Sequence, residues 1–165
     1  MSDKPSYLGL LNAIAVAERQ AGEYFQCWAA VTKDEDVRAV IHTVALRETE
    51  HGLAFEKRID ELGYGLIDKP DPGHAKRMKI ASSTKLTDRE KFEQLGIGRP
   101  QAEGKPDIFD RFFENKDIDP QTGGLLGRYV AEERDTGRKF AACYAALTAT
   151  TSKKKSPAKK SKKAA

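Results

Sequence analysis

Apolar residues recur every three or four positions along two long stretches in the first part of the chain. Between residues 6 and 32 this pattern follows Tyr7, Leu11, Ile14, Glu18, Ala21, Phe25 and Trp28. Between residues 34 and 62 it follows Val37, Ile41, Val44, Glu48, His51, Phe55 and Leu62. Such spacing places each set on one face of an α-helix, which repeats every ~3.6 residues. Both stretches are therefore predicted to be long helices that bury one face.

The connection between these two helices is very short. The turn falls at Thr32-Lys33, the acidic residues 34–36 suit the start of a helix, and Gly63 is placed to end the second one. A turn of this length requires the two helices to be antiparallel neighbours. We therefore expect a helical hairpin.

The second half of the chain is more interrupted. Residues 63–85, with Pro70, Pro72 and Gly73, are predicted to form a loop. A capping-box pattern over residues 87–90 predicts a helix that runs to about Leu95. The Gly- and Pro-rich residues 96–106 then predict irregular structure.

Two further helices are expected before the chain ends. A short one is predicted over residues 107–115, and a long one begins near Asp119-Pro120, with proline at an early helical position, and runs to about Leu147. No run of alternating β-branched residues is present. The fold class is therefore predicted to be all-α, with one domain over residues 1–149.

Three ionisable residues interrupt the apolar faces of the first two helices. Glu18 lies 14 residues before Thr32, and Glu48 lies 14 residues after Asp34, so their carboxylates are expected at similar depth in the hairpin. Burying a charge without a partner costs several kcal/mol, which indicates that something compensates these groups. Glu48 and His51 are three residues apart, and carboxylate oxygens with an imidazole are ligands suited to iron or manganese. His42 and His74 fall outside these faces and are expected at the surface.

Residues 13–62 resemble the first helical pair of the ferritin and rubrerythrin group, in which one helix supplies a Glu and the next a Glu-x-x-His motif. The resemblance implies a ferritin-like, antiparallel four-helix bundle that carries a carboxylate-bridged di-iron site. It further implies that Glu18 is a terminal ligand, Glu48 a bridging ligand and His51 the nitrogen ligand of one half of that site.

The last helix repeats part of this pattern. A shift of 85 residues superposes Glu48 on Glu133, and the corresponding face would contain Leu126, Val130, Glu133, Gly137, Phe140, Tyr144 and Leu147. The same shift places Thr136 where His51 stands, so the second histidine is missing. Glu133 is therefore a fourth candidate ligand in an incomplete second half-site.

The partner of Glu18 in that second half is ambiguous. The shift places Glu103 opposite Glu18, but Glu103 lies between Pro100 and Pro106 in a segment unsuited to a helix. Glu90 and Glu93 on the preceding helix are alternatives.

Four hypotheses follow for the metal site. It holds one ion, or an asymmetric pair that uses Glu133, or the complete half meets its copy in a homodimer or larger homo-oligomer, as in the two-helix encapsulated ferritins, or it has lost its metal. The resemblance implies an oxidase, peroxidase or iron-handling role in oxidative-stress defence. The rival hypothesis is a catalytically silent helical bundle with a role in assembly or nucleic-acid association.

Charge is distributed unevenly along the chain. The net charge is +4, but residues 151–165 contain seven of the 29 basic residues and no acid, so 22 basic and 25 acidic residues remain and the rest of the chain carries −3. Residues 150–165 are therefore predicted to be a disordered basic tail that could contact nucleic acid non-specifically through phosphates.

Location is inferred from what the sequence contains. No stretch is long and apolar enough to span a membrane, and no signal peptide is expected. Cys27 and Cys143 have neither CxxC spacing nor a nearby histidine, which favours free, buried thiols in the cytoplasm. Without a CxxC pair for electron transfer, a peroxidase of this type would need an external reductant.

Overall fold

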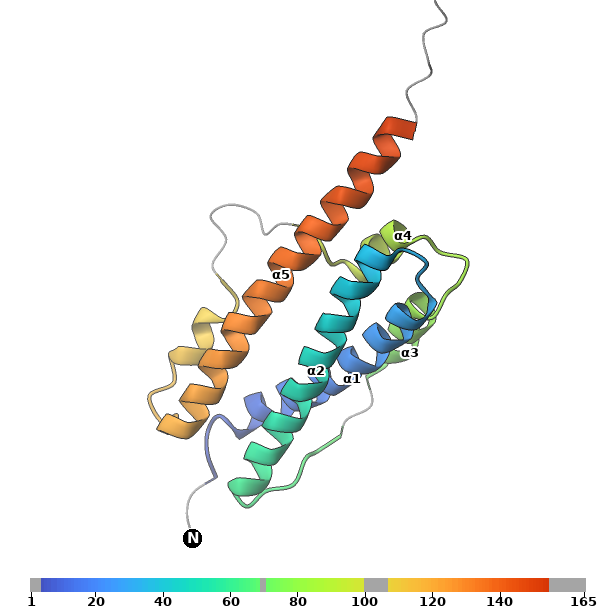
Figure 1. The fold of residues 1–165 in the computed structure, drawn as a ribbon. Helices are drawn as coiled ribbons and strands as arrows, with labels where there is room; N and C mark the ends of the chain where they lie inside the picture. The colour runs from blue at the N-terminus through green and yellow to red at the C-terminus, as the bar shows by residue number, and fades with distance from the viewer. Residues whose placement is uncertain (1–3, 69–70, 100–106, 155–165) are drawn as a thin grey trace, which may run out of the picture.

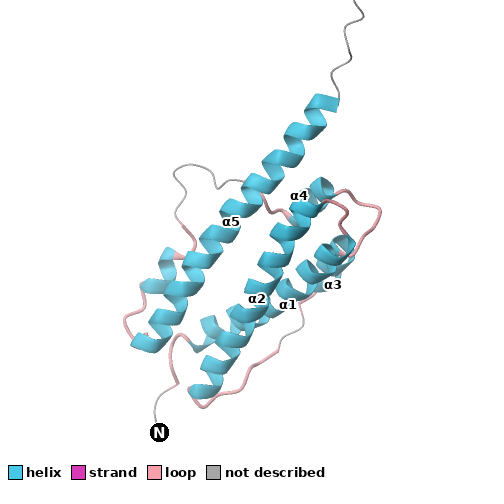
Figure 2. Cartoon of the chain, in the orientation of Figure 1, coloured by secondary structure: helices cyan, strands magenta, loops and turns pink. Residues whose placement is uncertain are grey.

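The computed structural model describes residues 4–68, 71–99 and 107–154, with side chains described up to Ala149. These residues form helices and connecting segments, without a strand in any of the three ranges (Figure 2). The elements are α1 (Leu8–Val31), α2 (Glu35–Glu61), α3 (His74–Ala81), α4 (Asp88–Leu95), the 3₁₀ turn η1 (Asp110–Phe113) and α5 (Pro120–Lys154) (Figure 1). The prediction of an all-α fold is confirmed.

The helices α1 and α2 form the expected antiparallel hairpin and share the most extensive interface of the fold. The seven predicted inner positions of α1 are all buried, and those of α2 are buried except for half-buried Leu62. The carboxylate of Asp34 caps α2 by accepting hydrogen bonds from the amides of Asp36 and Val37. Gly63 ends the helix with φ of 84°, a left-handed conformation that favours glycine.

The third long helix, α5, lies beside α2 and runs antiparallel to it (Figure 1). The Asp119 carboxylate fixes its start by accepting hydrogen bonds from the amides of Gln121 and Thr122, from the Tyr7 hydroxyl and from the Arg58 guanidinium. This network ties the beginning of α5 to both helices of the hairpin. Proline at the first helical position agrees with the prediction.

The other end of α5 differs from the prediction. The helix continues to Lys154 rather than ending near Leu147, so the predicted tail boundary at residue 150 falls inside it. Residues 155–165, most of the predicted disordered tail, lie outside the described residues.

Two short helices occupy the remaining space beside α1. Helix α3 packs on α1, and α4 contacts both α3 and α5. The described ranges thus contain three helices of 24, 27 and 35 residues and two of eight residues, not four long ones. The loop predicted over residues 63–85 is interrupted by α3, which the sequence analysis missed because this eight-residue helix buries only Ile80 and Ala81.

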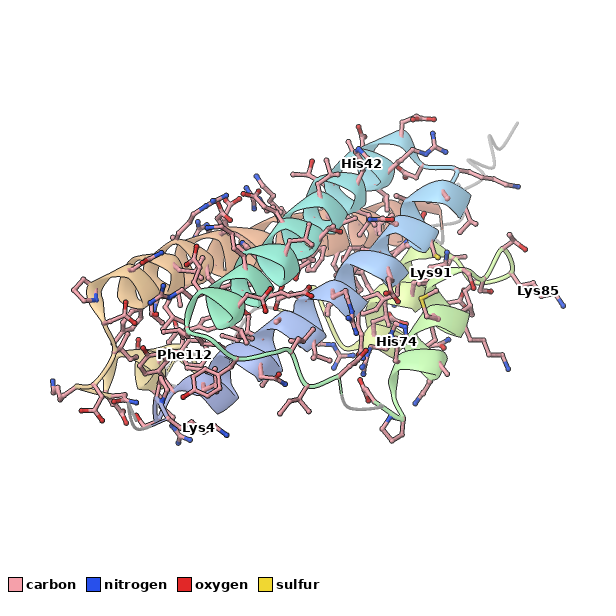
Figure 3. The ribbon with its side chains drawn as sticks, turned by 90° about the horizontal axis from the view of Figure 1, so that it is seen from below. Lys4, His42, His74, Lys85, Lys91 and Phe112 are labelled. Carbon is pink, nitrogen blue, oxygen red and sulfur yellow. The ribbon has the colours of Figure 1, made fainter. Side chains whose placement is uncertain are left out.

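The capping box predicted for α4 is present, with reciprocal hydrogen bonds between Thr87 and Glu90. Asp88 then holds the end of α1, since its carboxylate accepts hydrogen bonds from the Trp28 indole at 2.6 Å and the Thr32 hydroxyl at 2.7 Å. Lys91 extends from α4 with its ammonium 5.7 Å from the Trp28 ring (Figure 3). The helix predicted over residues 107–115 is the shorter 3₁₀ turn η1.

The core is divided into two apolar clusters. One contains Phe25, Trp28 and Phe140 at one end of the long helices. The other contains Leu11, Phe55, Leu126 and Tyr129 at the opposite end. On α1 the first cluster begins at Ala21 and the second ends at Ala15, so a polar layer at the depth of Glu18 separates them. None of the helices in the described ranges is long and apolar enough to cross a membrane.

Candidate metal centre

Four side chains from three helices converge in the polar layer. Glu18 comes from α1, Glu48 and His51 from α2, and Glu133 from α5, and each offers one ligand-type atom within 4.8 Å of the others. The first three residues are buried, whereas the side chain of Glu133 is 18% exposed. The structure therefore brings together all four residues that the sequence singled out, within one chain.

A close approach of α1 and α2 makes this convergence possible. A Cβ added to Gly52 would lie 2.9 Å from the backbone nitrogen of Arg19, and one added to Gly22 would lie 2.4 Å from the Thr49 hydroxyl oxygen. Both distances are shorter than real Cβ contacts. These contacts flank Glu18 and His51, because Arg19 follows Glu18 and Gly52 follows His51 along the chain. The two glycines therefore allow the helix spacing that lets the ligand-type side chains meet.

The imidazole of His51 is held at one nitrogen and free at the other. Its Nε2 lies 2.6 Å from Oε2 of Glu132, whereas its Nδ1 lies 3.6 Å from both Glu18 Oε2 and Glu133 Oε1. When Nε2 donates its proton to Glu132, the lone pair of the neutral ring is on Nδ1 and points between the two carboxylates. A histidine that binds metal usually donates the hydrogen of its other ring nitrogen to a carboxylate or another acceptor, as Nε2 does to Glu132 here.

Three buried atoms of the cluster have no hydrogen-bond partner within the described residues. They are Glu18 Oε2, His51 Nδ1 and Glu133 Oε1. Each unsatisfied buried polar atom costs about 1–3 kcal/mol, so three of them at one place are unusual in a folded protein. All three are atoms that coordinate metals, and a cation between them would satisfy them together. The residues present therefore fit a metal ion.

The carboxyl groups of the cluster repel one another strongly. Burial, the adjacent Glu18 carboxyl group and the charge of Glu133 raise the pKa of Glu48 to about 11. Burial and the Glu18 charge raise the pKa of Glu133 to about 7. For Glu18, burial acts to raise the pKa, but the nearby His51 and Glu48 side chains and the hydrogen bond from Tyr129 outweigh it and lower the pKa. Without a cation, the cluster therefore favours a proton on Glu48. A bound cation would offset the negative charge of the carboxylates in place of that proton.

The pKa of His51 is raised as well. Burial alone would lower it, but the nearby Glu18 carboxylate, the hydrogen bond with Glu132 and the charge of Glu133 dominate. A proton on the imidazole is therefore favoured by the surrounding carboxylates. Metal binding at Nδ1 would replace that proton.

Two residues that the sequence analysis missed complete the surroundings. Tyr129 donates a hydrogen bond to Glu18 Oε1 at 2.9 Å, which leaves Oε2 as the free oxygen, and its ring stands edge-on to His51 at 5.0 Å. Glu132 holds His51 Nε2. Glu132 also pairs with Arg128 four residues earlier, a pattern typical of a solvated helix face, so its only signal was its position next to Glu133.

The other candidate residues lie elsewhere or are not described. Glu90 caps α4, and Glu93 accepts hydrogen bonds from Arg89 and Tyr144, so neither belongs to the cluster. Glu103 lies outside the described residues. Neither glutamate of α4 is therefore the partner of Glu18 in a second half-site.

The two other histidines are not part of the cluster. His42 lies on the exposed face of α2, as expected (Figure 3). His74 begins α3 instead of lying in a loop, is half-buried, and pairs with Glu23 at 3.0 Å. Cys27 and Cys143 are free, as predicted, but half-buried rather than buried.

Comparison with known proteins returns no relative: no protein-family model, curated protein or solved structure matches the chain. The resemblance of residues 13–62 to the ferritin and rubrerythrin group therefore stays a hypothesis based on those residues. The function has to be inferred from the chemistry of the site.

Proposed function

We propose that this protein binds a transition-metal ion, iron or manganese, through Glu18, Glu48, His51 and Glu133. The observation that supports the proposal most strongly is the meeting of three buried ligand atoms that lack partners: Glu18 Oε2, His51 Nδ1 and Glu133 Oε1. Three carboxylates with one imidazole form a mainly oxygen ligand set, which suits Fe²⁺ or Mn²⁺ better than a soft, thiolate-preferring ion.

A purely structural polar cluster explains the same residues less well. Such a cluster is stable when its members satisfy one another, and a partly satisfied buried network is more costly than an apolar core. Here Tyr129 and Glu132 satisfy the outer atoms of Glu18 and His51, while the inner atoms that face one another remain unpaired. This inward arrangement supports a bound cation.

The ferritin-like interpretation is part of the proposal. It is supported by ligands at matching depth on α1 and α2, by the Glu-x-x-His spacing, and by Glu133 on the last long helix. In this arrangement α3 and α4 take the place of part of a fourth long helix. The proposed setting is the cytoplasm, and the proposed biological role is oxidase, peroxidase or iron-handling activity in oxidative-stress defence.

The protein's own residues have distinct tasks in this proposal. Glu132 orients the His51 ring, and Tyr129 orients the Glu18 carboxylate. The apolar clusters on both sides of the polar layer exclude water from it, which strengthens electrostatic interactions inside. A bound iron or manganese ion would supply redox chemistry that side chains alone lack.

Metal content tests the proposal. Protein purified without chelator is analysed for iron, manganese and zinc, and compared with a Glu48→Ala/His51→Ala variant. A His42→Ala/Glu56→Ala variant is the matched control, because it removes the same residue types from α2 outside the cluster. We expect metal in the unmodified and control proteins and loss of it in the first variant. Equal metal content in all three proteins, or none in any of them after incubation with Fe²⁺ and Mn²⁺, would refute the proposal.

A further inference from the structure

The cluster provides ligands for one ion. Its four ligand-type atoms lie within 4.8 Å of one another, and the three unpartnered atoms face a common point. His51 is the only imidazole among them. Within the described residues, no further carboxylate or imidazole joins this group.

A second ion bridged by Glu48 and Glu133 would need ligands from the side of α5. His51 follows Glu48 by three residues, and the corresponding residue after Glu133 is Thr136, which is buried. Its neutral hydroxyl is a much weaker ligand for iron or manganese than an imidazole or a carboxylate.

A cation already lies at this position. The guanidinium of Arg47, on α2 next to Glu48, donates hydrogen bonds to Asp135 at 2.6 Å and to Thr136 Oγ1 at 3.4 Å. Its side chain is 25% exposed, so its charge is only partly screened by water.

From this arrangement we infer that the centre binds a single metal ion, and that Arg47 and Thr136 exclude a second one. Arg47 holds a positive charge against Thr136, the position from which a second ion would need its nitrogen ligand, and Thr136 itself withholds that ligand. The inference rests on the proposed function, because it specifies how many ions that site accepts. It selects the single-ion hypothesis over the asymmetric pair, and completion within one chain over completion across a dimer.

Titration of metal-free protein with Co²⁺, followed through the visible absorption of the bound ion, counts the ions. We expect an end point of one Co²⁺ per chain, and with Mn²⁺ the sharp hyperfine pattern of an isolated ion in electron paramagnetic resonance. An end point of two, or an exchange-coupled manganese spectrum, would overturn the inference while leaving the proposed function intact. The absence of any binding would remove the proposed function itself.

A variant tests the two residues directly. In Arg47→Met/Thr136→His, the excluding charge is removed and an imidazole is supplied three residues after Glu133, so the end point should rise from one Co²⁺ per chain to two. Arg138→Met is the matched control, because Arg138 pairs with the same Asp135 from an exposed position and its removal should leave the end point at one. Circular dichroism shows whether each variant is folded. A folded double variant whose end point stays at one would contradict the role assigned to Arg47 and Thr136.

Discussion

Replacing Gly52 by alanine tests whether the contact between α1 and α2 sets the geometry of the candidate metal centre. The added Cβ would lie 2.9 Å from the backbone nitrogen of Arg19, 3.2 Å from its Cα and 3.3 Å from its Cβ. Two of these three atoms belong to the backbone of α1 and cannot rotate away. The helices would have to separate by several tenths of an ångström beside Glu18 and His51.

The size of the effect follows from two opposing contributions. Overpacking of a tight contact costs about 1–3 kcal/mol. Alanine is favoured over glycine inside a helix by about 1 kcal/mol, which offsets part of this cost. The free energy of unfolding should therefore fall by roughly 0–2 kcal/mol. The displaced backbone carries Glu18 and His51, so metal affinity should change more than stability. We expect it to fall by about tenfold or more, the size of effect seen when groups that orient metal ligands are replaced.

Gly127→Ala provides the control for Gly52→Ala. Gly127 lies in α5, and an added Cβ meets no atom within 4 Å, so this substitution should raise stability by about 0.5–1 kcal/mol. Urea denaturation with chelator present measures stability without metal, and titration with Mn²⁺ measures affinity. If Gly52→Ala is as stable as Gly127→Ala and binds Mn²⁺ as tightly as the unmodified protein, the close contact does not position the ligands.

Three further predictions concern the surroundings of the centre and the fold. Glu132→Gln should weaken metal binding by about 10–100-fold without unfolding the protein, because the substitution removes the negative charge behind His51; unchanged affinity in a competition titration would contradict this role. The hydrogen bonds to Asp119 hold its pKa below the ordinary value, so its contribution to stability is present above about pH 4 and is lost as the pH falls. Asp119→Ala should therefore lower the free energy of unfolding by about 0.5–2 kcal/mol at pH 7 and flatten the acid part of a profile of stability against pH. An unchanged profile would contradict this role of Asp119. Mn²⁺ at a hundred times its dissociation constant should stabilise the unmodified protein by about 2.7 kcal/mol in thermal or urea denaturation, and an equal gain in Glu48→Ala/His51→Ala would place the bound ion elsewhere.

Much of the hairpin and the convergence of its candidate ligands could be predicted because both depend on local rules. The ~3.6-residue period identified the buried faces of α1 and α2, and the two-residue turn fixed the relative depth of Glu18 and Glu48. Glu133 was found by the same comparison along the chain. Such a pattern indicates which residues share a helix face and how far each lies from the turn.

The features that were missed depend on contacts between distant segments. Gly137 was expected on the inner face of α5, but it is exposed and Thr136 is buried, because the face that meets α2 at that depth is centred one residue earlier. Glu132 forms an ordinary surface pair with Arg128 in sequence, and only the position of His51 on α2 gives it a role at the site. The helix α3 lacks an apolar period of its own and depends on packing against α1.

Anomalous X-ray diffraction from crystals soaked with Mn²⁺ would locate an ion bound between Glu18, His51 and Glu133. We expect one anomalous peak inside the polar layer, about 2–2.5 Å from His51 Nδ1 and from an oxygen of each of Glu18 and Glu133. A fully loaded crystal whose only peaks lie at surface carboxylates, with His51 Nδ1 still unpaired, would contradict it.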